Sequence, residues 1–153
     1  ELCKNWNTEL VCEDGRVRLL VDGKSPEEEI RTVETSAAVS HVAAVPFVRD
    51  WMKAQQRESV RFGNLVMEGR DIGSNIFPET QFKFYMDASL EERQARRAAD
   101  GVQENLAARD QRDSSRKASP LVVSEGAMVI NNSGETPEET SGRIIAEIER
   151  KLR

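Results

Sequence analysis

The sequence NLVMEGRDIG, residues 64–73, places a short apolar run directly before a turn that contains two glycines. The run predicts a strand over Asn64–Glu68, and the glycines allow the backbone to turn tightly behind it. The turn then presents Arg70 and Asp71 side by side, in the position where α/β proteins place working residues at the carboxyl ends of strands. An ordinary surface turn with an ion pair has the same local sequence, so the function of this segment depends on the rest of the chain.

The segments on both sides of this turn predict an α/β protein. Before it, the pattern predicts an Asp-Gly hairpin over residues 8–21, a helix beginning at Ser25-Pro26, and helices over residues 35–44 and 45–59. After it, we expect strands over residues 82–86 and 127–130, a helix over residues 90–99 with a capping box formed by Ser89 and Glu92, and a last helix from Thr136. Strands separated by helices indicate a parallel sheet, whose working edge would carry Arg70, Asp71, Asp87 and Ser133.

A second signal is the arginine-rich sequence RDQRDSSR, residues 109–116. Arginines three and four positions apart lie along one side of a helix, and each guanidinium is a rigid fork that matches phosphate. Phosphoryl transfer needs such positive charge, and the interleaved aspartates would keep the arginines apart when no substrate is bound. These features suit a mobile lid. The alternative interpretation is a solvated, salt-bridged helix face.

Composition narrows the class of protein. The 153 residues include 22 basic and 27 acidic residues, a net charge of −5, and only 5% aromatic residues, which does not favour a nucleic-acid partner. No apolar run is long enough for a membrane span, and Glu1–Leu10 has no signal-peptide pattern, so we expect a cytoplasmic protein without a membrane partner. Cys3 and Cys12 form no CxxC pair, so we expect neither a metal site nor a disulfide.

Several motifs, in order along the chain, resemble the bacterial cytidylate kinase family of P-loop nucleoside monophosphate kinases. They are LVMEGRDIG (65–73), FP (77–78), KFYMDAS (83–89), EER (91–93), RDQRD (109–113), SR (115–116) and SPL (119–121), preceded by IRT (30–32), SHVAA (40–44) and PFVR (46–49). The resemblance covers essentially the whole chain. It implies a three-layer α/β/α core with a parallel sheet over residues 63–97 and 119–153, a small β/α monophosphate-binding insert over residues 1–62, and a helical lid over residues 98–118.

The resemblance also implies a set of substrate-binding residues. Ser40 and Arg49 match the residues that read the cytosine base, and Asp71 matches an acid that helps to hold the nucleotide. Arg70 and Arg116 match arginines that grip phosphate. With two lid residues that close over the sugar and phosphates, the implied CMP site comprises Ser40, Arg49, Arg70, Asp71, Arg109, Asp113 and Arg116.

The implied catalytic residues are arginines. They are Arg70, Arg109, Arg112 and Arg116, with Arg112 assisting on the ATP side. Mg²⁺ would act as the complex with ATP, without a prosthetic group or a metal site built from the protein's own residues. The expected partners are CMP, dCMP and ATP, and we expect the intact protein to be a monomer.

The chain departs from the family at the ATP site. The family cradles phosphate in a Gly-rich loop that follows the first strand, and no GxxxxGK[ST] motif is present here. Gly23-Lys24-Ser25 has no glycine five residues before Gly23. We therefore expect the P-loop and the first strands to be missing from this chain, and the chain alone to be inactive. The lid is also short, with eleven residues between Arg97 and Arg109.

Three functions follow from these observations. The first is transfer of the ATP γ-phosphoryl group to CMP or dCMP, which gives CDP or dCDP. The second is a related kinase that uses UMP or a small alcohol. The third is a CMP-binding fragment without catalysis, because the P-loop is absent.

Overall fold

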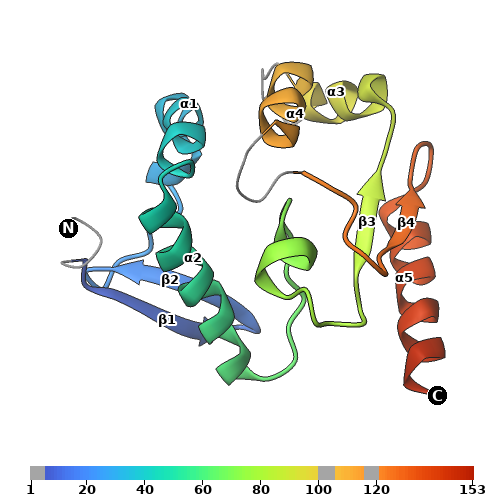
Figure 1. Cartoon of the computed structure of the whole chain (residues 1–153), viewed down its shortest axis with the longest axis horizontal. Helices are drawn as coiled ribbons and strands as arrows, with labels where there is room; N and C mark the ends of the chain where they lie inside the picture. Colours follow the sequence, from blue (N-terminus) through green and yellow to red (C-terminus); the bar gives the residue numbers. More distant parts are fainter. Residues whose placement is uncertain (1–5, 100–105, 116–120) are drawn as a thin grey trace. The chain divides into compact units, whose positions relative to one another are not determined.

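The computed structural model describes residues 6–99, 106–115 and 121–153 (Figure 1). The chain divides into two compact units, residues 1–67 and residues 68–153. Each unit has its own small sheet, β1–β2 in the first and β3–β4 in the second.

The first unit contains an antiparallel hairpin of β1 (Thr8–Glu13) and β2 (Arg16–Val21). The strands pair from Thr8↔Val21 to Glu13↔Arg16, so the connecting loop has two residues. Asp14 has φ 50° and Gly15 has φ 70°. Positive φ at both loop residues is the backbone of a type I′ turn, whose twist matches that of the strands. The hairpin predicted from the Asp-Gly sequence is confirmed.

The predicted helix beginning at Ser25-Pro26 is wrong. The chain instead makes one 3₁₀ turn (Glu29–Arg31), and α1 (Val33–Val42) begins after it. Thr32 separates the two, because its backbone is extended (φ −82°, ψ 160°) and its side chain accepts a hydrogen bond from Thr35 N. A capping residue with extended backbone ends one helical turn and starts the next.

The helix predicted from Val45-Pro46 is confirmed as α2 (Pro46–Glu58), which continues into a 3₁₀ turn, Ser59–Phe62. Two contacts join this helical segment to the N-terminal part of the unit. The rings of Trp6 and Trp51 meet edge to face, with centroids 5.6 Å apart and an interplanar angle of 82°. Arg61 Nη2 donates to the carbonyl of Leu10, at 2.7 Å.

The predicted strand over Asn64–Glu68 is absent from the structure. These residues belong to neither sheet of the described part of the chain, and the side chain of Val66 is fully exposed. A strand is defined by its backbone hydrogen bonds to a neighbour. The apolar pattern is correct for a strand, but no described segment pairs with it.

The second unit contains a parallel pair, β3 (Phe84–Asp87) and β4 (Met128–Asn131). The register runs from Phe84↔Met128 to Asp87↔Asn131, and Ile130 is completely buried. The helices α3 (Leu90–Ala99) and α4 (Leu106–Ser114) lie between the two strands in sequence. Parallel strands connected through helices confirm the predicted α/β class.

The last helix, α5 (Pro137–Leu152), begins with a capping box. Thr136 Oγ1 accepts from Glu139 N at 3.2 Å, and Thr136 N donates to Glu139 Oε2 at 2.8 Å. Near its start, Arg143 donates to the carbonyl of Asn131; near its end, Lys151 donates to the carbonyl of Gln81. The helix therefore runs antiparallel to the strand pair, beside β4 in Figure 1.

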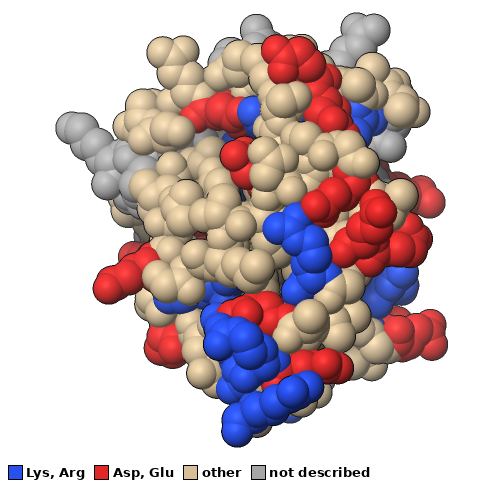
Figure 2. Space-filling model, turned by 90° about the vertical axis from the view of Figure 1, so that its right-hand side faces the viewer, with Lys and Arg blue, Asp and Glu red and all other residues tan. Residues whose placement is uncertain are grey.

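The outer side of α5 is charged. Figure 2, which faces the side where α5 lies in Figure 1, shows basic and acidic side chains interspersed. Arg150 and Lys151 both pair with Glu147 on this helix. Among the apolar residues of α5, Ile144 and Ile148 are half-buried, whereas Ile145 and Leu152 are exposed. Among the described residues, no helix has the length and apolarity needed to cross a membrane.

Candidate active site

The Gly69–Gly73 turn is fixed by its own main chain. A Cβ atom added at Gly69 would lie 2.7 Å from Cγ1 of Ile72, so this position requires glycine unless Ile72 moves. The carbonyl of Asp71 accepts from Asn75 N at 2.8 Å and from Ile76 N at 3.3 Å, which produces a π-helical turn over Ile72–Ile76.

The side chain of Arg70 is directed to a carboxylate on α4. Arg70 Nη1 lies 3.7 Å from Oδ1 of Asp110, and Arg93 Nη1 donates to Oδ2 of the same carboxylate at 2.6 Å. Arg93 is itself held at the end of β3, because its Nε donates to the carbonyl of Ala88 at 3.2 Å. A continuous series of contacts therefore links the glycine-flanked turn, α4, α3 and the end of β3.

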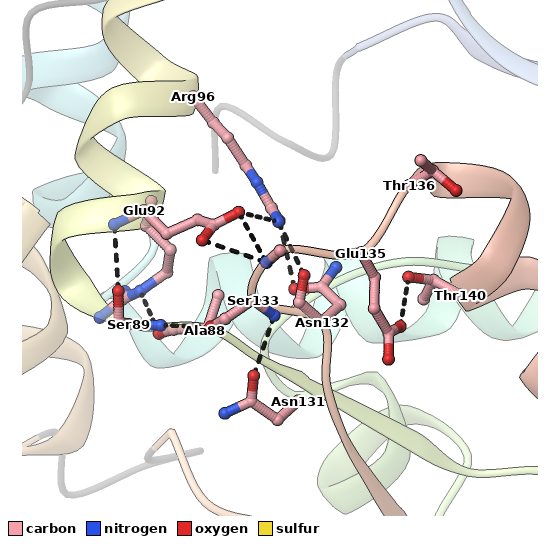
Figure 3. Close-up of polar contacts among 12 residues, drawn as sticks. Ala88, Ser89, Glu92, Arg96, Asn131, Asn132, Ser133, Glu135, Thr136 and Thr140 are labelled. Carbon is pink, nitrogen blue, oxygen red and sulfur yellow. Dashed lines mark hydrogen bonds and ion pairs between the residues drawn. The ribbon is translucent and has the colours of Figure 1, made fainter.

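The first turn of α3 is bound to the loop that follows β4 (Figure 3). Ser89 Oγ accepts from Glu92 N at 3.2 Å, as predicted for a helix cap. The predicted reciprocal half of the capping box is wrong. Ser89 N donates to Ser133 Oγ, and the Glu92 carboxylate accepts from Gly134 N and from Arg96 Nη2. The carboxylate thus joins α3 to the loop instead of accepting from the backbone N–H of its own N-cap residue, Ser89.

Arg96 strengthens the same junction. Its guanidinium donates to the side-chain oxygen and to the carbonyl of Asn132, at 3.1 and 2.9 Å (Figure 3). Asn132 N in turn donates to the carbonyl of Asp87 at 2.9 Å. The ends of β3 and β4 are therefore adjacent, as predicted for Asp87 and Ser133.

This arrangement affects the acidity of Glu92. The hydrogen bond from Gly134 N–H and the hydrogen bond from Arg96 both favour the charged carboxylate, and they hold the pKa of Glu92 below its usual value of 4.5. The Glu92 carboxylate is therefore ionised at neutral pH.

The predicted site residues fall in both units. In the second unit, Arg70 and Asp71 lie in the turn. The α4 residues among them, of which only the backbone is described, are Arg109, Arg112 and Asp113. Arg116 lies outside the described residues. In the first unit, Ser40 belongs to α1, with its side chain outside the description, and Arg49 is a half-buried residue of α2. The roles assigned to these residues remain predictions.

Arg93 and Asp110 were not among the site residues predicted from the sequence. The feature of the sequence that could have indicated Asp110 is the alternation of aspartates and arginines in residues 109–116, because it suggests paired charges. In the structure, Arg93 forms an ion pair with Asp110, and Arg96 forms one with Glu92. Together with Arg97 and the buried Leu106, Arg93 and Arg96 line a shallow hollow of about 180 Å³.

The Gly23-Lys24-Ser25 segment and the potential metal ligands form no functional site among the described residues. Gly23 and Lys24 form a tight turn at the end of β2, where Lys24 N donates to the carbonyl of Val21. This turn is not a phosphate loop, because no helix follows it directly. Across the described ranges, no three His, Cys, Asp or Glu side chains are grouped to hold a metal ion, and Cys12 is an exposed free thiol.

Comparison with known proteins identifies the family. The sequence profile of the family described as "Cytidylate kinase" matches residues 1–150. A cytidylate kinase of Caldanaerobacter subterraneus subsp. tengcongensis is 39% identical over 147 residues, which cover 89% of this chain and 66% of that protein. A cytidylate kinase of Bacteroides fragilis is 35% identical over 152 residues, 92% of this chain and 66% of that protein.

A third relative is a bifunctional pantoate ligase/cytidylate kinase of Synechococcus sp., 39% identical over 140 residues, 84% of this chain and 27% of that protein. The chain spans just under two thirds of the length of the two monofunctional relatives. These matches confirm the predicted resemblance and its α/β fold class. The chain belongs to the cytidylate kinase family.

Proposed function

We propose that the natural protein carrying this chain transfers the γ-phosphoryl group of ATP to CMP or dCMP and releases CDP or dCDP. The observation that carries this proposal is the family match over residues 1–150, together with relatives named as cytidylate kinases. The geometry of the second unit supports it, because a fixed glycine-flanked turn presents Arg70 beside the arginine-bearing helix α4.

Phosphoryl transfer depends on positioning and on positive charge around the transferred group. In the proposed site, Arg70 binds the phosphate of the acceptor nucleotide through its planar guanidinium fork. Arg109 and Arg116 would approach the same phosphates from the lid, and Arg112 would assist on the ATP side. The described position of Arg109 and Arg112 on α4, the helix that contacts Arg70 through Asp110, is consistent with these roles.

Recognition of cytosine is assigned to Ser40, Arg49 and Asp71. Cytosine has an exocyclic amine that donates hydrogen bonds, whereas uracil has a carbonyl that accepts them. A site built to pair with the amine rejects uracil because its polar groups would be left unpaired. UMP should therefore be a poor acceptor.

The proposal assigns Mg²⁺ to the nucleotide. Mg²⁺ would enter as its complex with ATP, where it neutralises the phosphate charge, as in other phosphoryl-transfer enzymes. The residues described here bind and orient the acceptor.

The decisive experiment replaces Arg70 with alanine in the natural protein. We expect kcat/KM for CMP to fall by about 10²–10³-fold, as for the loss of one preorganised charge-stabilising donor. Phosphorylation of CMP, dCMP and UMP is measured with saturating Mg-ATP. Arg150→Ala is the matched control, because Arg150 is an exposed arginine of α5 that pairs only locally with Glu147; its activity should equal that of the wild type.

Two outcomes would contradict the proposal. A wild-type preference for UMP would refute the cytosine assignment. Turnover of CMP by the Arg70→Ala variant at the wild-type rate would refute the role of Arg70.

A further inference from the structure

The carboxylate of Asp110 lies between two arginines that belong to different parts of the second unit. Its Oδ2 accepts from Arg93 Nη1 at 2.6 Å, and its Oδ1 lies 3.7 Å from Arg70 Nη1. The Asp110 side chain is 26% exposed and that of Arg70 is 30% exposed. Water therefore screens these charges less than it would screen fully exposed ones.

Arg93 gives Asp110 a rigid support. The guanidinium of Arg93 spans from Asp110 to the carbonyl of Ala88, a buried residue directly after β3. The backbone of Arg93 is also held in the first turn of α3, because its N–H donates to the carbonyl of Ser89 at 3.0 Å. On the side of α4, Leu106 is buried and anchors the start of that helix. Asp110 is thus held in place by its own helix, α4, and by Arg93 on α3.

Arg70 itself lies outside the helices and strands, in the turn that leads into the π-helical turn Ile72–Ile76. The long side chain of an arginine has many rotamers, and its contacts select among them. Without Asp110, the guanidinium groups of Arg70 and Arg93 would face the same space with like charge. The 3.7 Å ion pair between Arg70 and Asp110 offsets this repulsion.

We propose that Asp110 is a positioning residue for Arg70: it links α4 to the end of β3 through Arg93 and holds the Arg70 guanidinium ready to bind the acceptor phosphate. This inference rests on the proposed function, because the phosphate is that of the acceptor nucleotide. Asp110 itself touches neither nucleotide in this scheme. It acts on the orientation of Arg70, and a misplacement of about 1 Å in a positioned group costs about 10²-fold in rate.

The test compares Asp110→Asn with Glu92→Gln in the natural protein. Both substitutions remove one carboxylate charge from an arginine pair involving α3, but Glu92 contacts Arg96 and the 131–134 loop, not Arg70. We expect Asp110→Asn to lower kcat/KM for CMP by about 10–100-fold with a raised KM for CMP, while KM for ATP stays within twofold. Glu92→Gln should keep kcat/KM within threefold of the wild type.

Thermal unfolding and a conservative variant separate positioning from folding. Asp110→Glu keeps the charge and should recover most of the CMP affinity lost in Asp110→Asn. If thermal unfolding shows that Asp110→Asn folds poorly, KM for CMP is compared between Asp110→Glu and the wild type. The inference is overturned if Asp110→Asn keeps KM for CMP within threefold, or if KM for CMP and KM for ATP rise equally.

The proposed function has its own readout, which is wild-type turnover of CMP. If the wild type phosphorylates a different nucleoside monophosphate, the proposed function fails, and the same variants are compared on that acceptor. If the wild type turns over none, both proposals fail.

Discussion

The two junctions made by α3 differ in how they are built. The junction between the first turn of α3 and the loop after β4 has several hydrogen bonds, and most of them involve backbone groups of Ser89, Asn132 and Gly134. At the junction of α4 with α3, the described ion pairs centre on one carboxylate, Asp110, which lies between the guanidinium groups of Arg93 on α3 and Arg70 in the turn. The first junction joins elements whose positions are set by strand pairing, and the second joins two helices and a turn.

This difference separates stability from function. A junction made with backbone groups persists whenever β3 and β4 pair, so its side chains contribute to the free energy of unfolding. An ion pair of one charged side chain, such as that of Asp110, can be broken and remade without unfolding the unit, and substrate binding can alter it. We therefore expect substitutions at the first junction to change stability, and substitutions at the second to change the kinetics of the acceptor.

The largest effect on stability should come from Ile130→Ala, beneath the first junction. Ile130 is completely buried on β4, and truncation of such a side chain removes apolar burial and leaves a cavity. We expect the free energy of unfolding to fall by about 2–5 kcal/mol. The measurement is denaturant unfolding of the natural protein, with Val129→Ala as the control on the same strand, where the side chain is 51% exposed. Equal losses for the two variants would show that β4 is not the core of this unit.

A smaller loss should follow from Thr136→Ala at the start of α5. Thr136 makes both halves of a capping box with Glu139, and loss of such a cap costs about 1 kcal/mol. Thr136→Ser keeps the hydroxyl and should retain most of the stability. KM for CMP should be unchanged in both variants, because the cap touches neither Arg70 nor Asp110. An altered KM with normal stability would contradict the separation of the two junctions.

The elements that were predicted correctly have short-range signals. The hairpin follows from Asp14-Gly15 between alternating strands, and α5 follows from Thr136-Pro137 with acids in the first turn. In each case, the interactions that fix the structure lie within a few residues of the signal. The sequence therefore contains both the pattern and its cause.

The elements that were predicted wrongly depend on partners distant in sequence or on competition between signals. Asn64–Glu68 has the composition of a strand, but a strand needs a neighbour, and no local pattern specifies one. Ser25-Pro26 is a good helix start, but Thr32 seven residues later is a better one. The capping box of Ser89 and Glu92 fails for a similar reason, because Gly134, 42 residues away, competes for the Glu92 carboxylate.

The candidate site shows the same limit. The resemblance identified Arg70 by its place in a motif, but the importance of Asp110 and Arg93 depends on distances between a turn and two helices. Spacing along residues 109–116 indicated that aspartates and arginines would pair, but it could not indicate which ones. The pairing of Asp110 with Arg93 crosses from α4 to α3 and is a property of the folded unit.

The smallest expected effect concerns the pH dependence of the first junction. The hydrogen bonds from Gly134 and Arg96 hold the pKa of Glu92 below 4.5 in the folded protein. Since the folded pKa is lower than the unfolded one, the ionised carboxylate stabilises the fold at pH above the unfolded pKa, and this contribution is lost as the pH falls through the folded pKa. Glu92→Gln should therefore be less stable than the wild type at pH 7, and the difference should shrink below pH 4.5.

Denaturant midpoints of the wild type and of Glu92→Gln, measured at pH 7 and at about pH 3, give this difference directly. Glu138→Gln, an exposed acid in the first turn of α5, is the control for the general effect of removing one carboxylate. If the difference between the wild type and Glu92→Gln were the same at both pH values, the Glu92 charge would not stabilise the junction. The backbone hydrogen bonds of Ser89 and Asn132 would then be sufficient to hold α3 to the loop, and the contrast with the single carboxylate of Asp110 would be sharper still.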